Sequence, residues 1–319
     1  MNKLIRLILY ITAGCIGVGI AALISGLVLG GGHLAWEEDG IFDRAEQAVQ
    51  KVTSDHKRRV KTAEKTETPQ TDYEAYDYSF EEETDFAGDI GLLTVDASSI
   101  QVLTIDLQHG CLYIEESDDS RICVSVSGSG NMIDDIQAVC ESGCISISDQ
   151  RTGNRSREDV DIYLQIPADI RLDTVEMKIN AGQLESDCRF TAKDLTVKAD
   201  AGQITLSDVG ADALYASVGA GEMDISDSSF ASVNLKCGVG VMDIEASIEA
   251  DSWIECGMGS VNLELENGPD SVNYVLHCGA GTIQVGDRSY SGLAKKSRIE
   301  NGSSSTFTLE CGMGQICID

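Results

Sequence analysis

One short phrase recurs seven times between Val175 and Asp319, and it constrains the fold more than any other feature. Each copy closes with a glycine, and two positions earlier stands a glycine, an asparagine or an aspartate. Most steps from one copy to the next are 19 or 20 residues, because the closing glycines occupy positions 182, 202, 221, 240, 259, 281 and 314. A fixed period of this length is typical of stacked supersecondary units.

Apolar residues alternate with polar ones on both sides of each closing glycine. They occupy the third, fifth and seventh positions before it and the second and fourth after it, and only Ser186 and Ser252 interrupt these five columns. Each unit is therefore expected to be a strand, a turn and a second strand, with the columns facing inward. The residue that opens the turn is of a type that tolerates positive φ. The closing glycine permits either a second unusual torsion angle or close backbone packing.

Neighbouring units of this kind would pair strand to strand, about 4.8 Å apart, through right-handed crossovers. We therefore predict an all-β fold, a right-handed, single-stranded β-solenoid that resembles a β-helix. A β-sandwich built from hairpins is the alternative, but columns that repeat over seven units favour stacking. Alternating segments between Ile90 and Pro167 predict further strands, so the repeat domain is expected to span residues 90–319, with clear repeats from 175. The polar segment 149–159, which contains Arg151, is expected to be an exposed loop.

Residues 1–32 are expected to form a transmembrane anchor. No charged residue lies from position 7 to position 32, and this length can span a bilayer as a helix. Lys3 and Arg6 precede the segment and three acidic residues follow it, so the positive-inside rule places the N-terminus in the cytoplasm and the C-terminal domain outside. A cleaved signal peptide has a shorter apolar region. A lipobox ending at Cys15 would lack the usual leucine and the polar tether that follows a lipidated cysteine.

Residues 33–89 are expected to link the anchor to the repeat domain. Apolar residues recur at roughly helical spacing within 43–59, which predicts a short juxtamembrane helix. Residues 62–89 are rich in threonine, glutamate and aspartate, a composition typical of an extended, disordered tether.

The chain is strongly acidic, with a formal net charge of −30 from 53 acidic and 23 basic residues. This charge argues against a nucleic-acid partner and against docking on anionic lipid. Acidic residues are dense between positions 199 and 287, but their 19-residue period does not match the nonapeptide repeat of a calcium-binding roll. Outward carboxylates on a solvated sheet are the preferred interpretation, and no metal or cofactor is expected.

The chain contains 11 cysteines, and four of them share one inward column. Buried free thiols are the preferred interpretation, because a thiol is small and weakly polar. Neighbouring rungs would bring the Cα atoms within bridging distance, but in-register parallel side chains do not readily reach the torsion angle of a disulfide. A metal site is disfavoured because no CxxC or Cys/His spacing occurs. The four residues are Cys237, Cys256, Cys278 and Cys311.

The chain resembles a bacterial family of unknown function, domain of unknown function 4097, whose members are described as candidate adhesins with β-strand repeats. The resemblance covers residues 90–319. It rests on the N-terminal anchor, on the phrase at 162–167 that leads into the repeats, and on the repeats as far as Ile318. It implies a cell-envelope location with an adhesive or envelope-stress role, and it implies no catalytic residues. The cysteine column and the long linker depart from the family pattern.

Two places are candidate partner-binding sites. An insertion at 286–306 delays the last repeat and holds the only basic cluster of the repeat region, and Trp253 should point outward by the alternation. The cluster consists of Tyr290, Lys295, Lys296 and Arg298.

We therefore expect a membrane-anchored cell-envelope protein without catalytic activity, acting as an adhesive, structural or binding module. Its partner would be an envelope protein or a glycan. A sensor of envelope stress that works through the linker is one alternative. A polysaccharide-active enzyme is another, disfavoured because the four histidines fall in no recognisable catalytic motif and because aromatic platforms for sugars are lacking.

Overall fold

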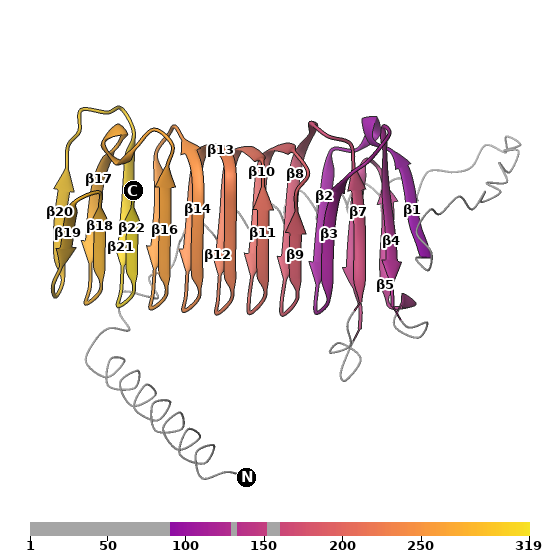
Figure 1. Cartoon of the computed structure of the whole chain (residues 1–319), viewed down its shortest axis with the longest axis horizontal. Coiled ribbons are helices and arrows are strands. Elements are labelled where there is room, and N and C mark those ends of the chain that lie inside the picture. The colour runs from indigo at the N-terminus through magenta and orange to yellow at the C-terminus, as the bar shows by residue number, and fades with distance from the viewer. Residues whose placement is uncertain (1–89, 129–132, 152–159) are drawn as a thin grey trace, which may run out of the picture. The chain divides into compact units, whose positions relative to one another are not determined.

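The computed structural model describes residues 90–128, 133–151 and 160–319, and strands dominate this part of the chain (Figure 1). The predicted anchor (1–32) and linker (33–89) lie outside the described residues. Within the described ranges, no helix is long and apolar enough to cross a membrane. The elements are β1 (Ile90–Asp96), the 3-10 turn η2 (Ala97–Ser99), β2 (Val102–Leu107), β3 (Cys111–Glu116), β4 (Arg121–Ser127), β5 (Ile136–Glu141), β6 (Cys144–Asp149), β7 (Asp161–Ile166), β8 (Ile170–Ile179), β9 (Gln183–Ser186), β10 (Phe190–Ala199), β11 (Gln203–Ser207), β12 (Val209–Val218), β13 (Glu222–Cys237), β14 (Val241–Ile248), β15 (Ser252–Cys256), β16 (Ser260–Leu265), the 3-10 turn η4 (Pro269–Ser271), β17 (Asn273–Cys278), β18 (Thr282–Val285), β19 (Arg288–Ser291), β20 (Lys295–Ile299), β21 (Thr306–Cys311) and β22 (Gln315–Ile318).

Each repeat unit forms one rung, in which a strand, a glycine turn and a second strand follow one another. The rungs stack in parallel register, so the predicted all-β solenoid is confirmed (Figure 1). We call the strands that precede the glycine turns the first sheet and those that follow them the second sheet. The long strand β13 belongs to both, because it passes from the second sheet to the first at a register shift between Ile225 and Ser228.

The core lies between the two sheets and is filled by the five predicted columns. Every residue of these columns in the seven repeats is buried, including Ser186 and Ser252. Ser252 is satisfied there, because its hydroxyl accepts a hydrogen bond from the amide of Val233 at 3.1 Å and donates one to the carbonyl of Ala250 at 3.1 Å. Side chains of successive rungs therefore meet in flat layers, and burial of each large apolar side chain contributes about 1.5–3 kcal/mol.

The glycine turns stack directly on one another, and this stacking explains the repeated glycine. A Cβ on Gly202 would lie 2.5 Å from the carbonyl oxygen of Gly182 and 2.9 Å from Cγ2 of Ile179, and the other closing glycines meet the neighbouring rung in the same way. In the seven repeats, neither the residue that opens the turn nor the closing glycine has positive φ. The prediction of positive φ is therefore wrong, and the prediction of close backbone packing is confirmed.

The order of the rungs differs from the order of the repeats along the chain. The last unit, β21–β22, lies between β15–β16 and β17–β18, and it pairs in parallel with both (Figure 1). The expectation that sequence neighbours stack throughout is therefore wrong at this end. The insertion at 286–306 lets the chain travel past the sixth unit and return into the gap beside it.

The other end of the solenoid is built in the same way. Strands β2 and β3 form a rung that pairs with β8 and β9, although paired residues such as Leu103 and Val175 lie 72 positions apart in sequence. Strands β6 and β7 form the next rung outward. Gly110 takes the place of the closing glycine, and a Cβ on Gly182 would overlap its carbonyl oxygen. The repeat architecture therefore begins well before Val175.

Antiparallel strands close both ends of the stack. At one end β4 pairs with β7, β1 with β4, and β5 with β6. At the other end β20 pairs with β17 and β19 pairs with β18. This change from parallel to antiparallel pairing means that the parallel edge of the repeat is not presented at either end of the stack.

A buried ion pair ends the ladder of turns beside β2 and β3. Asp149 takes an inward position, and its carboxylate accepts hydrogen bonds from Arg151 Nε at 2.9 Å and from Arg151 Nη2 at 2.8 Å. It also accepts the backbone amides of Gln108 and His109, at 3.3 and 3.4 Å, and Arg151 Nη2 donates to the carbonyl of His109. The carboxylate thus accepts amides that, in the glycine turns of the repeats, donate to backbone carbonyls of the neighbouring rung. Arg151 is only 2% exposed, so the prediction that it lies on an exposed loop is wrong.

Candidate binding surfaces

Trp253 faces outward from the first sheet, as predicted, because both of its neighbours in β15 face the core. In-register pairing places it beside Asn234 of β13, and places Asn234 beside Tyr215 of β12. On its other side Trp253 lies beside Thr308 of β21. Tyr215, Asn234 and Trp253 therefore form a continuous segment, which we call the aromatic row.

Asn234 is more deeply buried than an outward-facing residue of a flat sheet is expected to be. It is 9% exposed, and its Oδ1 atom has no hydrogen-bond partner among the described residues. Tyr215 and Trp253 flank it on the two adjacent strands. The aromatic row therefore contains an unsatisfied acceptor between two half-exposed rings.

The predicted basic cluster separates into two parts. Lys296 and Arg298 are exposed and pair with the outward residues His277 and Val275 of β17, so they extend the outward face that carries Trp253. Arg298 shares a line across the sheet with Trp253, two strands intervening.

Tyr290 and Lys295 belong instead to the end of the solenoid. Tyr290 pairs with the inward residue Ile283 and packs against the core, and the ammonium group of Lys295 lies 5.7 Å from the centre of its ring. These two residues cover the end of the apolar interior. The structure therefore brings only Lys296 and Arg298 into one surface with Trp253.

An ion pair and a histidine–carboxylate contact accompany the aromatic row on the side nearer the glycine turns. Lys236 Nζ lies 3.5 Å from a carboxylate oxygen of Glu255, and His277 Nδ1 lies 3.1 Å from Glu310 Oε1. All four side chains are at least one-third exposed, so these contacts are screened by solvent and contribute little to stability. They do supply hydrogen-bonding groups beside the rings.

A second aromatic pair lies on the second sheet. Tyr113 and Tyr163 stack with their ring centres 5.4 Å apart and their planes at 22°. A hydrogen bond involving Cys111 raises the pKa of Tyr113 to about 12, so its hydroxyl is protonated at neutral pH. Because these two rings cover each other, they do not by themselves overturn the expected lack of aromatic platforms.

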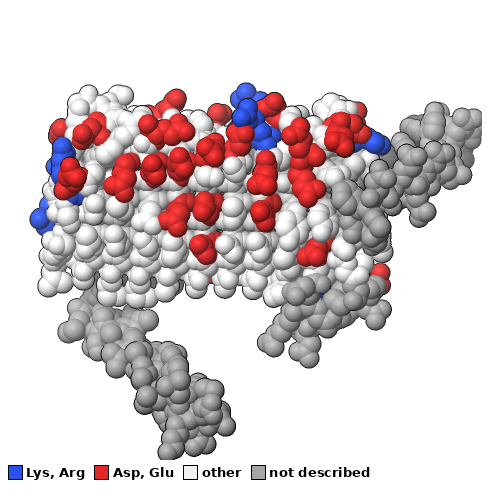
Figure 2. Space-filling view, in the orientation of Figure 1, with Lys and Arg blue, Asp and Glu red and all other residues white. Residues whose placement is uncertain are grey.

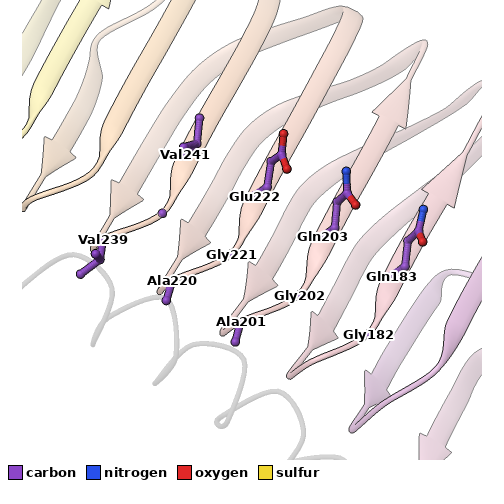
Figure 3. A pocket seen from close by; sticks show the side chains of 11 residues that line it. Gly182, Gln183, Ala201, Gly202, Gln203, Ala220, Gly221, Glu222, Val239 and Val241 are labelled. Atoms are coloured by element: carbon purple, nitrogen blue, oxygen red, sulfur yellow. The ribbon is translucent and has the colours of Figure 1, made fainter. Parts of the chain in front are cut away.

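The glycine-turn edge carries a shallow open groove of about 530 Å³. Ala201, Ala220 and Val239 project from the turn tips, and side chains of the following strands form its other margin (Figure 3). Val239, Met258 and Met313 are 58%, 41% and 57% exposed. Acidic side chains concentrate on the upper part of the face seen in Figure 2, and the strip along the turns is nearly free of charge.

The acidic residues do not converge on a cation site in the described part of the chain, where no group of three potential metal ligands occurs. Asp224 and Asp243 lie side by side on the second sheet, and Asn262 Nδ2 donates a hydrogen bond of 2.5 Å to Asp243. These carboxylates point outward in rows.

The four cysteines of the inward column form a ladder in the order Cys237, Cys256, Cys311, Cys278. All four are buried free thiols, and each donates to the carbonyl of its own closing glycine at 3.1–3.2 Å. Interaction with Cys237 raises the pKa of Cys256 to about 11, and the same interaction lowers the pKa of Cys237. Interaction with Cys256 raises the pKa of Cys311, and burial raises that of Cys278. The ladder is part of the core.

The family model described as Toastrack DUF4097 matches residues 100–307, well over half of the chain. The chain belongs to the Toastrack family. The match begins two residues before β2, which agrees with a repeat architecture that starts before Val175.

Three solved structures are similar to this chain at low sequence identity and with TM-scores below 0.5. A candidate adhesin from Bacteroides fragilis is 15% identical with a TM-score of 0.38, and the alignment covers 72% of this Toastrack chain and 97% of the other. A candidate cell adhesion protein from Clostridium sporogenes is 16% identical, with a TM-score of 0.31 and coverage of 72% and 97%. A candidate lipid-binding protein from Parabacteroides distasonis is 12% identical, with a TM-score of 0.35 and coverage of 73% and 97%. The curated proteins contain no match.

Tyr215 and Asn234 are the site residues that the sequence analysis missed. They occupy the sixth position before their closing glycines, the same position as Trp253. The signal was present in this outward column, in which Tyr215, Asn234 and Trp253 come from consecutive units. The inward columns, from which the fold was predicted, do not contain these outward residues.

Proposed function

We propose that this Toastrack protein is a single-pass membrane protein of the cell envelope, and that its extracytoplasmic solenoid is a binding module without catalytic activity. The aromatic row, continued by Arg298, carries the proposal. It is an outward surface with two half-exposed aromatic rings and a buried unsatisfied acceptor, and aromatic and arginine side chains are the residues that binding surfaces favour.

The membrane location rests on the sequence. The uncharged segment at positions 7–32, with Lys3 and Arg6 before it, favours an anchor whose C-terminal domain lies outside the cytoplasm. Residues 33–89 would then hold the solenoid at a distance from the bilayer.

Labelling of intact cells tests the location. Cys317 and Cys123 are partly exposed free thiols, so a membrane-impermeant maleimide should modify them without permeabilisation. The variant Cys317→Ser should incorporate less maleimide than the parent protein, by the amount that Cys317 takes up. Labelling that requires permeabilised cells would contradict the proposed topology.

Binding to envelope material tests the function. The full chain in detergent micelles should be retained by the isolated cell-wall and envelope fractions of the cells that produce it. Joint replacement by Trp253→Ala and Arg298→Ala should reduce retention about tenfold. Arg121→Ala is the matched control, because Arg121 is an equally exposed arginine on β4 of the other sheet. Equal retention of the double variant would contradict a binding role for this face.

A further inference from the structure

The aromatic row has a spacing that suits one class of ligand. Tyr215 and Trp253 lie on strands separated by one other strand, so their attachment points are two strand spacings apart, roughly 9.6 Å. Because the row crosses the strands, this spacing runs along the axis of the solenoid. It is close to the length of a disaccharide in an extended β-1,4-linked glycan, in which every second sugar presents the same face.

An extended peptide does not match this spacing. Side chains on one face of a strand recur about every 6.6–6.8 Å, so the two rings would fall out of register with them. An anionic polymer is also disfavoured, because Glu255 and Glu310 lie beside the row and the chain carries a net charge of −30.

The polar groups of the site complement sugar hydroxyls. Asn234 Oδ1 is a buried acceptor without a partner in the described structure, and an unsatisfied acceptor of this kind favours a bound donor. Lys236 and Glu255, 3.5 Å apart, supply a donor and an acceptor one row away. On the side of the aromatic row away from the glycine turns, Ala213 of β12 pairs with Ser232 of β13. These small side chains leave space beside the rings.

We propose that the aromatic row binds a neutral, extended β-1,4-linked glycan along the solenoid axis. Tyr215 and Trp253 stack on sugars two units apart, and a shift of either ring opens the covered Asn234 Oδ1 to a sugar hydroxyl between them. The inference rests on the proposed binding function and names its ligand class.

Titration calorimetry of the full chain in micelles with chitohexaose and cellohexaose tests the proposal, with maltohexaose as the α-linked comparison. We expect binding of at least one β-1,4-linked hexaose, and at least tenfold weaker binding of maltohexaose. Trp253→Ala and Tyr215→Ala should each weaken binding about tenfold. Tyr163→Ala, which changes an outward tyrosine on the other sheet, should leave binding unchanged.

Asn234→Leu separates recognition from folding. It removes the orphaned acceptor and keeps the side-chain volume, so thermal stability should stay equal or rise while glycan affinity falls at least fivefold. Unchanged affinity in this variant would overturn the role of Asn234.

The fluorescence of Trp253 gives a readout that leaves the site intact. Trp36 and Trp253 are the two tryptophans, so Trp36→Phe makes Trp253 the sole reporter. Its emission should shift on addition of the bound hexaose. Absence of binding and of any shift at millimolar hexaose would overturn the glycan assignment, and retention on envelope material in the same preparation would leave the proposed binding function standing. Loss of hexaose binding together with loss of retention on envelope material would count against the glycan assignment and against the proposed binding function.

Discussion

At the scale of single residues, the solenoid depends on small atoms at a few backbone contacts. The closing glycines leave no room for a side chain, because each lies against the backbone of the turn beside it. The same constraint does not apply to Gly91 of β1, where an added Cβ would meet nothing within 4 Å. The glycines of the repeat are therefore a packing requirement of the stack.

Gly202→Ala should lower the free energy of unfolding by about 1–3 kcal/mol, because the new methyl group would overlap the carbonyl of Gly182. Urea unfolding of the full chain, followed by far-UV circular dichroism, measures this change. Gly91→Ala is the matched control and should change the free energy by less than about 0.5 kcal/mol. Equal effects in the two variants would refute the packing argument.

Asp149 and Arg151 should make stability depend on acid pH. Burial alone would raise the pKa of Asp149, but hydrogen bonds from Arg151 hold it below the ordinary value of 3.8. A carboxylate whose pKa is depressed by folding adds stability above its unfolded value, and this stability is lost as the pH falls through the folded value. The contribution should therefore be complete at pH 5–7 and decline below about pH 4.

Arg151→Met should lower the free energy of unfolding by about 3–5 kcal/mol at pH 7, because it leaves a buried carboxylate without its partner. Denaturation at pH 7 and at pH 3 measures both effects. The difference between variant and parent should shrink at the lower pH. A difference independent of pH would show that lost packing, and not charge, causes the effect.

At the scale of elements, the sequence was sufficient for the rung but not for the order of the rungs. The five inward columns predicted strand, turn and strand because alternation and glycine spacing are local properties. No local pattern specifies the position of the β21–β22 rung. The units that contain Cys256, Cys278 and Cys311 have equivalent sequences around the turn, so the pattern allows their rungs to stack in either order. Arg151 was wrongly predicted to be exposed for a related reason, since its partner His109 lies 42 positions earlier in the sequence.

Truncation after Ser305, which removes β21 and β22, should unfold more than the deleted residues. Strands β17 and β18 pair in parallel only with this rung, so their amides should lose protection from hydrogen exchange. Hydrogen exchange followed by mass spectrometry measures this, with a chain lacking only Asp319 as the control. Full protection of β17 and β18 in the truncated chain would mean that they pack directly on β15 and β16.

At the scale of the whole solenoid, the order of the rungs sets how far Arg298 lies from the aromatic row. Because β21 lies between β15 and β17, Thr308 and Val275 separate Trp253 from Arg298 along one line of the first sheet. With the rungs in chain order, Trp253 would lie beside Val275. The identity of the residue beside Trp253 on the next strand therefore tests the order of the rungs.

Nuclear Overhauser contacts of the Trp253 indole in the methyl-labelled full chain are the most direct measurement. The structure predicts a cross-peak between the indole and the methyl group of Thr308, its neighbour on the adjacent strand. It predicts none with the methyl groups of Val275, which lies two strands away, roughly 9.6 Å. A cross-peak to Val275 without one to Thr308 would contradict the rung order and, with it, the position of Arg298 relative to the aromatic row.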